Sequence, residues 1–169
     1  GARPISKLKL GNFLVSVGAA NTGGGEVGLR DRSGEGHIPI SAALAFDHSG
    51  SMTSRPVAMR DMTLAGDTFL RAMQLEGAPT DDAAELIKFS ERADVVVPFT
   101  SSRDPLLAGL SSPYRQGFTT ALVDATYLAV QDAAVQPHQN AVVVFTDGGE
   151  NNSRVNEKDL IDQANTLRV

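Results

Sequence analysis

The chain has 169 residues, a net charge of −5 at pH 7 and no cysteine. This length fits one domain with a core of ordinary size, and a hydrophobic content of 41% supports a packed fold. The excess of acidic residues argues against a nucleic-acid-binding face. The lack of cysteine excludes disulfides, thiolate metal sites and cysteine nucleophiles, and no stretch approaches the ~20 apolar residues of a membrane span.

The first 38 residues are expected to form an N-terminal extension. Residues 8–17 have the composition of a strand, a glycine cluster follows at 22–25, and residues 26–30 form a second short extended piece. We therefore expect a β-hairpin within 1–38, appended to a main domain at 39–169.

Four strands are expected in the main domain. The apolar runs at 39–46 and 140–146 predict strands that are buried on both faces. The segments 84–90 and 93–100 predict a strand pair joined by a tight turn. Pro98 suits an edge strand, where its missing N–H is harmless.

Helices are expected between these strands and after the last one. The first is predicted to begin at Ser54, a suitable N-cap, with Pro56 in its first turn. The others are predicted at 103–110, 120–134 and 156–167. This alternation predicts an α/β fold with a doubly wound, mostly parallel central sheet and helices on both faces.

Three polar clusters fall at the carboxyl ends of the predicted strands, where folds of this class bind ligands. They are residues 47–52, residues 117–125, which precede and open a helix, and residues 146–150. Their side chains are mainly carboxylates and hydroxyls. Oxygen ligands select a hard cation, which favours Mg²⁺ first, with Mn²⁺ or Ca²⁺ as alternatives.

The pattern Asp47-x-Ser49-x-Ser51 resembles the D-x-S-x-S signature of the von Willebrand factor A domain family, which includes the integrin inserted domains. Thr120, two residues before a leucine, lies where that family places its metal-binding threonine. Asp147 occupies the aspartate position of the family's Thr–Asp–Gly motif. The resemblance runs from about residue 40 to the end of the chain.

This resemblance implies a metal-ion-dependent adhesion site. Ser49, Ser51 and Thr120 would supply hydroxyls, and Asp47 and Asp147 would act directly or through water. A Glu or Asp of a partner protein would complete the metal's shell in a charge-assisted contact. The implied function is a metal-dependent protein-binding or adhesion module, without enzymatic activity. An extracytoplasmic location is favoured, although related domains also act inside cells.

Two details of the predicted site remain open. Thr119 directly precedes Thr120 and could supply the hydroxyl in its place, but Thr120 is the preferred ligand. Outside the ligand set we expect a structural role for Asp124 and positions on the rim of the site for His48, Phe118, Glu150 and Asn151.

The alternative function is an Mg²⁺-dependent phosphotransfer enzyme similar to the haloacid dehalogenase superfamily. Asp47 would be the nucleophile and Asp147 would hold the metal. That family has an acid two residues after its nucleophile, where this chain has Ser49. It also needs a lysine near the phosphate, whereas Lys88 and Lys158 are predicted within a strand and a helix, away from a strand's carboxyl end.

The family fold also has two further strands after the helix at 156–167, whereas this sequence ends at Val169. The family resemblance therefore predicts a domain truncated at its C-terminal end. The strand at 140–146 would then have an unpaired apolar edge, which natural proteins avoid. We expect a following segment, the hairpin at 8–30 or a second copy of the chain to pair with it.

Overall fold

The structure, a computed structural model, describes residues 38–78 and 81–169. The predicted N-terminal hairpin lies outside the described residues. The elements in chain order are β1 (Ile40–Asp47), α1 (Gly50–Thr53), α2 (Pro56–Ala72), β2 (Ala83–Phe89), β3 (Ala93–Thr100), α3 (Arg103–Ser111), α4 (Leu122–Ala134), β4 (Gln139–Phe145) and α5 (Glu157–Leu167).

The described strands form one mixed sheet in the order β3-β2-β1-β4. β1 runs parallel to both β2 and β4, and β3 runs antiparallel to β2. The prediction of a mostly parallel α/β sheet is confirmed, and Pro98 lies in β3, at an edge of the described sheet. This topology brings the carboxyl ends of β1, β2 and β4 to the same end of the sheet.

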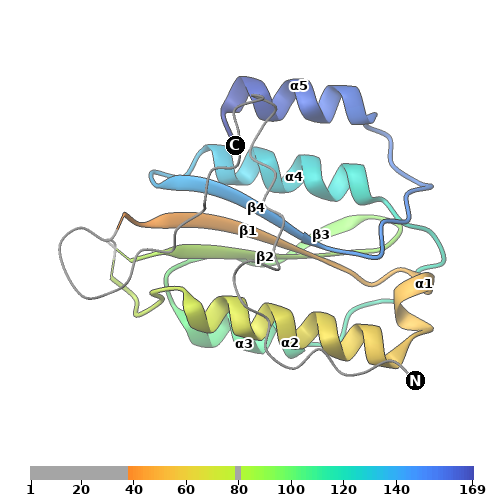
Figure 1. Cartoon of the computed structure of the whole chain (residues 1–169), viewed down its shortest axis with the longest axis horizontal. Helices are drawn as coiled ribbons and strands as arrows, with labels where there is room; N and C mark the ends of the chain where they lie inside the picture. The colour runs from red at the N-terminus through yellow and green to blue at the C-terminus, as the bar shows by residue number, and fades with distance from the viewer. Residues whose placement is uncertain (1–37, 79–80) are drawn as a thin grey trace, which may run out of the picture.

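The helices cover both faces of the sheet, as predicted. Figure 1 shows α2 and α3 below the sheet and α4 above it, with α5 on the outer side of α4. Leu44 and Phe46 of β1 belong to the core between the sheet and the layer of α2 and α3. Ala43 and Ala45 belong to the core between the sheet and α4. Gly66 lets α2 approach closely, because a Cβ there would lie 2.7 Å from the Phe46 ring.

The start of α2 differs from the sequence prediction. An additional short helix, α1, follows β1, and Ser54 is its C-cap, with its hydroxyl donating to the Ser51 carbonyl at 3.1 Å. Arg55 is the N-cap of α2 and Pro56 is its first residue. The predicted N-cap at Ser54 is therefore wrong, because the loop after β1 closes a helical turn of its own.

The outer edge of β4 has no partner strand in the described part of the chain. Its residues are half-buried except for the exposed Gln139, so the prediction of a strand buried on both faces is wrong for β4. The α5 side chains, all of which the structure describes, include none that is buried, and Ile161 is 56% exposed. Pairing of another segment with this edge stays a prediction.

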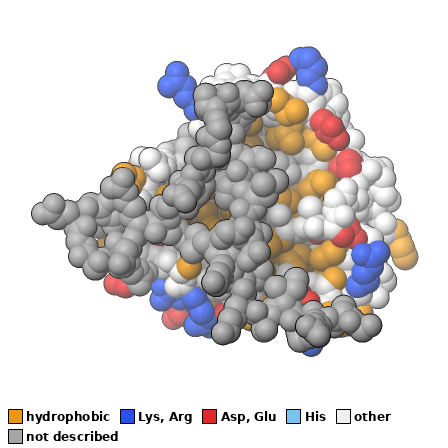
Figure 2. Space-filling model, in the orientation of Figure 1, with side chains coloured by type: hydrophobic (Ala, Val, Ile, Leu, Met, Phe, Trp, Pro, Cys, Tyr) orange, Lys and Arg blue, Asp and Glu red, His pale blue; other side chains and the backbone are white. Residues whose placement is uncertain are grey.

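The described surface carries mixed charges. On the face shown in Figure 2, blue Lys and Arg side chains lie near red Asp and Glu side chains and form no continuous basic patch among the described residues. In this part of the chain no helix combines the length and apolar character needed to cross a membrane.

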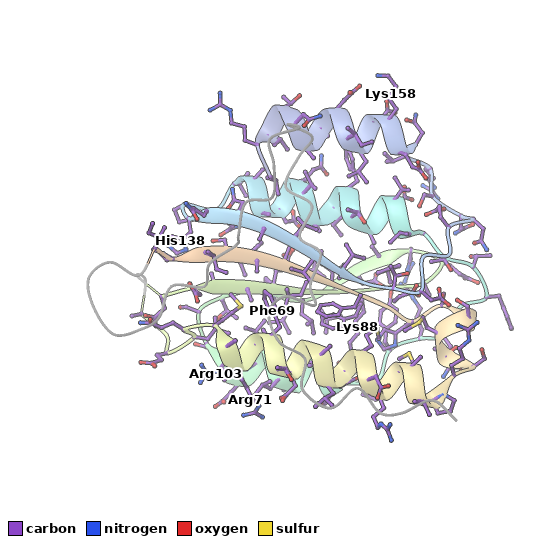
Figure 3. All side chains as sticks on the ribbon, viewed as in Figure 1. Phe69, Arg71, Lys88, Arg103, His138 and Lys158 are labelled. Carbon is purple, nitrogen blue, oxygen red and sulfur yellow. The ribbon has the colours of Figure 1, made fainter. Side chains whose placement is uncertain are left out.

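Several buried or half-buried polar side chains lie toward the amino ends of the strands, opposite the predicted metal site. His138, labelled in Figure 3, lies with its Nδ1 3.2 Å from the Ser41 hydroxyl. Glu85 of β2 is buried, and its Oε1 has no hydrogen-bond partner among the described residues. Burial, followed by the charge of Asp132 and a hydrogen bond with it, raises the pKa of Glu85 from 4.5 to about 8. Glu85 is therefore protonated at neutral pH.

We expect Glu85→Gln to reduce the pH dependence of folding stability. The folded-state pKa is raised, so the protonated carboxyl stabilises the fold fully below pH 4.5, and this contribution is lost as the pH rises through about 8. Between about pH 6 and about pH 9 the wild-type protein should lose about 2 kcal/mol of unfolding free energy, and the variant clearly less. Urea unfolding at both pH values measures this, with the exposed Glu76→Gln as the control. Equal losses in wild type and Glu85→Gln would contradict the assignment.

Candidate metal site

Asp47 forms the base of the candidate site, at the carboxyl end of the central strand β1. Its side chain is completely buried. One carboxylate oxygen accepts the Ser49 backbone N–H at 2.8 Å, and the other accepts the Thr146 hydroxyl at 2.7 Å. These two donors stabilise the buried charge and fix the carboxylate in one orientation.

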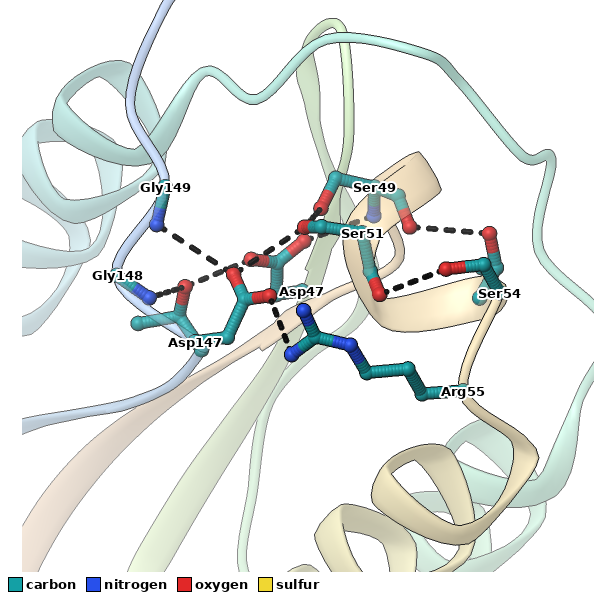
Figure 4. Close-up of polar contacts among 10 residues, drawn as sticks. Asp47, Ser49, Ser51, Ser54, Arg55, Asp147, Gly148 and Gly149 are labelled. Carbon is teal, nitrogen blue, oxygen red and sulfur yellow. Dashed lines mark hydrogen bonds and ion pairs between the residues drawn. The ribbon is translucent and has the colours of Figure 1, made fainter.

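Two serine hydroxyls lie together above Asp47 (Figure 4). Ser49 is the N-cap of α1 and Ser51 lies in its first turn, so the short helix turns both hydroxyls to the same side. The two Oγ atoms are 3.1 Å apart, and Ser51 Oγ donates to Asp147 Oδ1 at 3.2 Å. The structure thus brings the two predicted serine ligands together with the predicted aspartate from β4.

Asp147 lies at the surface, on the loop after β4. Its Oδ2 is 3.5 Å from the Arg55 guanidinium, and its Oδ1 accepts the Gly149 N–H at 3.4 Å. Gly148 has a positive φ of 86°, a conformation that glycine adopts without strain, and this reverses the chain directly after Asp147. The turn points the carboxylate back toward Ser51.

Thr120 borders the same space from the third loop. A Cβ built on Gly149 would lie 3.8 Å from Thr120 Oγ1 and 3.6 Å from Asp147 Oδ1. Thr120 is buried, whereas Thr119 is half-buried. The predicted helix start at Thr120 is wrong, because α4 begins at Leu122. The Thr120 N–H instead donates to the Asn151 side chain at 2.8 Å.

The donor set fits a hard divalent cation. Oxygens on adjacent corners of an octahedral shell are about 3 Å apart when the metal–oxygen distance is about 2.1 Å, and the Ser49–Ser51 and Ser51–Asp147 distances of 3.1 and 3.2 Å match this spacing. No group of three His, Asp or Glu side chains in the described ranges could hold a metal. A metal at this site therefore depends on the hydroxyls as well as on the two carboxylates.

Glu150 has a structural role that the sequence analysis did not identify. Its carboxylate accepts the Val123 N–H in the first turn of α4 at 2.9 Å, and it also accepts from Asn152 and from the backbone and hydroxyl of Ser153. Burial opposes ionisation, but these hydrogen bonds outweigh it and lower the pKa of Glu150 to about 2. Glu150 thus fastens the loop of Asp147 to the helix that follows Thr120.

Asn151 and Asp124 complete this connection between the loop and α4. Besides receiving the Thr120 N–H, Asn151 donates its own N–H to the Thr120 carbonyl at 3.1 Å. Asp124 accepts the backbone N–H groups of Arg154 and Val155, both at 2.9 Å. These contacts agree with the structural role expected for Asp124. They join residues about thirty positions apart, so no local sequence signal marks them.

His48 is expected on the rim of the site as a solvated residue, but its side chain is only partly exposed. Its ring lies edge-on to Tyr114, with ring centroids 5.2 Å apart. Burial and the positive charge of Lys88 lower the pKa of His48 to about 4, against the opposing effect of Asp47. The imidazole is therefore neutral at physiological pH.

The position of Lys88 bears on the alternative phosphotransfer function. Contrary to prediction, Lys88 lies near the carboxyl end of β2, but Figure 3 shows it between the sheet and the layer of α2 and α3. Its buried ammonium donates to the Leu110 and Ser112 carbonyls at 3.2 and 2.5 Å, near the C-terminus of α3. The ammonium group of Lys88 thus caps the C-terminal carbonyl groups of α3, so its position does not support a phosphate-binding role.

Comparison of the sequence with known domain families places the chain in one of them. A sequence profile of the von Willebrand factor type A domain matches residues 43–150. The chain belongs to this family. No curated protein sequence matches the chain significantly.

Several solved structures share the fold, among them a von Willebrand factor domain. The domain of the type V pili tip protein Mfa5 from Porphyromonas gingivalis has a TM-score of 0.61 and 17% identity, over 72% of this chain and 43% of that one. Proximal thread matrix protein 1 from the mussel byssus, with a zinc-occupied MIDAS motif, has a TM-score of 0.65 and 14% identity, over 78% of this chain and 35% of that one. BatB from Bacteroides thetaiotaomicron has a TM-score of 0.58 and 22% identity, over 75% of this chain and 62% of that one. The chain spans less than two thirds of each of these proteins.

We expect Glu150→Gln to weaken this type A domain at neutral pH. The change keeps the size of the side chain but removes the charge that accepts the Val123 N–H at the start of α4 and the donors of Asn152 and Ser153, so the unfolding free energy should fall by about 1 kcal/mol. The ionised carboxylate stabilises the fold above pH 4.5, and this contribution is lost as the pH falls toward about 2. The variant should therefore be less sensitive to acid than the wild type. Chemical unfolding tests this against the exposed Glu157→Gln, which should change little.

Proposed function

We propose that this domain is a metal-dependent protein-binding module. A divalent cation would be held by Asp47, Ser49, Ser51, Thr120 and Asp147 and presented to an acidic residue of a partner protein. The observation that carries the proposal is the run of oxygens from Ser49 through Ser51 to Asp147, at separations of 3.1 and 3.2 Å. The zinc-occupied MIDAS motif of the mussel byssus protein supports a divalent cation in a domain of this fold.

The charges favour binding to an acidic group. The formal charges of Asp47 and Asp147 only balance that of a divalent cation, and the neutral hydroxyl ligands add no further negative charge. Both oxygens of Asp47 already accept hydrogen bonds within the protein. A carboxylate from a partner can then enter the open side of the shell, and this contact requires no nucleophile or general base. We therefore propose a binding role without catalysis.

The oxygen-only ligand set favours Mg²⁺, with Mn²⁺ or Ca²⁺ as alternatives. We also propose an extracytoplasmic location, at a cell surface, in secreted form or in a periplasm. The similar structures include a domain of a pili tip protein and a byssus matrix protein, which supports such a location.

We expect Thr120→Ala to weaken Mn²⁺ binding at least about tenfold, because one ligand oxygen is lost. Thr120 is buried and the change also removes its methyl group, so the unfolding free energy should fall by about 1 to 2 kcal/mol while the fold is kept. Titration of Mn²⁺ followed by electron paramagnetic resonance measures the affinity, and thermal unfolding checks the fold.

Two matched variants make this test specific. Thr120→Ser keeps the hydroxyl and should retain Mn²⁺ binding. Thr119→Ala removes the neighbouring hydroxyl and its methyl group, leaves Thr120 in place and should also retain it. If Thr119→Ala loses the metal while Thr120→Ala keeps it, the ligand assignment is wrong.

The partner chemistry is tested by selecting phage-displayed random peptides on the domain in Mg²⁺ and eluting them with EDTA. Peptides released by EDTA should be enriched in Glu and Asp for the wild type and not for Thr120→Ala. Equal enrichment for both proteins, or wild-type binding that survives EDTA, would show that recognition does not use the proposed metal.

A further inference from the structure

Phe118 is an exposed aromatic residue beside the candidate metal site. It is 94% exposed, the highest value among the large hydrophobic side chains in the described residues. An apolar ring this exposed contributes little to the core, so its position in the fold does not depend on its own burial.

The backbone of Phe118 packs directly against the loop that carries the two serine hydroxyls. A Cβ built on Gly50 would lie 3.3 Å from the Gly117 carbonyl oxygen and 3.5 Å from Phe118 Cα. Gly50 stands between Ser49 and Ser51, and Ser49 also forms a parallel bridge with Gly117. The ring therefore projects into solvent from a point next to two of the proposed ligands.

The chain is anchored on both sides of this ring. At Gly117 a Cβ would lie 2.7 Å from Glu91 Cγ and 2.9 Å from Ser90 Oγ, so only glycine packs here without displacement. Further along, the Ala121 N–H donates to the Ser90 carbonyl at 2.7 Å. An aromatic ring on a backbone held in this way loses little conformational freedom on binding, which favours its use as a contact residue.

The charge on another side of the site complements this apolar contact. Arg55 has a side chain that is 64% exposed, and its guanidinium lies 3.5 Å from Asp147. Its positive charge adds to that of the proposed metal and favours a carboxylate there. The surface around the site thus combines attraction for an acid with one protruding apolar ring.

We propose that Phe118 determines which acidic partner binds, by packing against an apolar side chain that flanks the partner's metal-binding Glu or Asp. The partner is a protein segment in which an acidic residue has a large aliphatic or aromatic neighbour. This inference rests on the proposed metal-dependent binding function and specifies its partner class.

The test uses the Mg²⁺-dependent peptide selection on the wild type and on Phe118→Ala. Wild-type peptides released by EDTA should carry an apolar residue near the acid. Phe118→Ala should still select acidic peptides but without the apolar neighbour. Synthetic copies of the wild-type peptides should bind Phe118→Ala about tenfold more weakly or worse, and Phe118→Leu within about threefold of the wild type.

Val135→Ala is the matched control, because Val135 is 79% exposed and lies at the opposite end of α4. It should leave both the selected sequences and the affinities unchanged. Acidic peptides without an apolar neighbour, or equal affinities for wild type and Phe118→Ala, would overturn the role of Phe118 while leaving the proposed function intact. Wild-type selection with no EDTA-released acidic peptides would overturn both.

Discussion

The completely buried carboxylate of Asp47 requires hydrogen-bond donors, and those donors tie the site together. The Ser49 N–H comes from the loop after β1, and the Thr146 hydroxyl comes from the end of β4. The second contact extends the β1–β4 register, in which Phe46 is opposite Phe145, by one further residue pair. The loops that carry the serines and Asp147 are thereby fixed relative to the sheet.

The third loop is held by a separate polar network. Thr120 donates its N–H to the Asn151 side chain and accepts the Asn151 N–H at its carbonyl. Glu150 accepts N–H groups from its own loop and one from the start of α4. The position of Thr120 therefore depends on Glu150 and Asn151, which follow Asp147 in the chain. Loops connected in this way hold their oxygens close together before any cation binds, which reduces the ordering that binding requires.

The buried carboxyl groups at the two ends of the sheet, those of Asp47 and Glu85, have different surroundings. At the proposed metal end, each oxygen of the Asp47 carboxyl accepts a hydrogen bond. At the amino end, Glu85 lies beside another carboxyl and is protonated at neutral pH, because burial and Asp132 raise its pKa to about 8. Both oxygens of the buried carboxyl therefore have donors at the end where a cation is proposed to bind, whereas Glu85 Oε1 has none among the described residues.

The sequence by itself determined the order of strands and helices in the main domain, because apolar periodicity is a local property. It also predicted that the loops of Asp47 and Asp147 would meet, since parallel strands end at the same edge of a sheet. The apolar composition of residues 140–146 predicted burial on both faces, whereas β4 is half-buried, because burial depends on the elements that pack around a strand and β4 lies at an edge of the described sheet.

Only the tertiary structure decided how the loops close around the site. Ser54 ends α1 and does not begin α2, and His48 is partly buried beside Tyr114. The role of Glu150 depends on the N–H of Val123 at the start of α4, 27 residues earlier in the chain. Such contacts join segments that are distant in sequence. Whether they form depends on tertiary packing, which no local sequence pattern encodes.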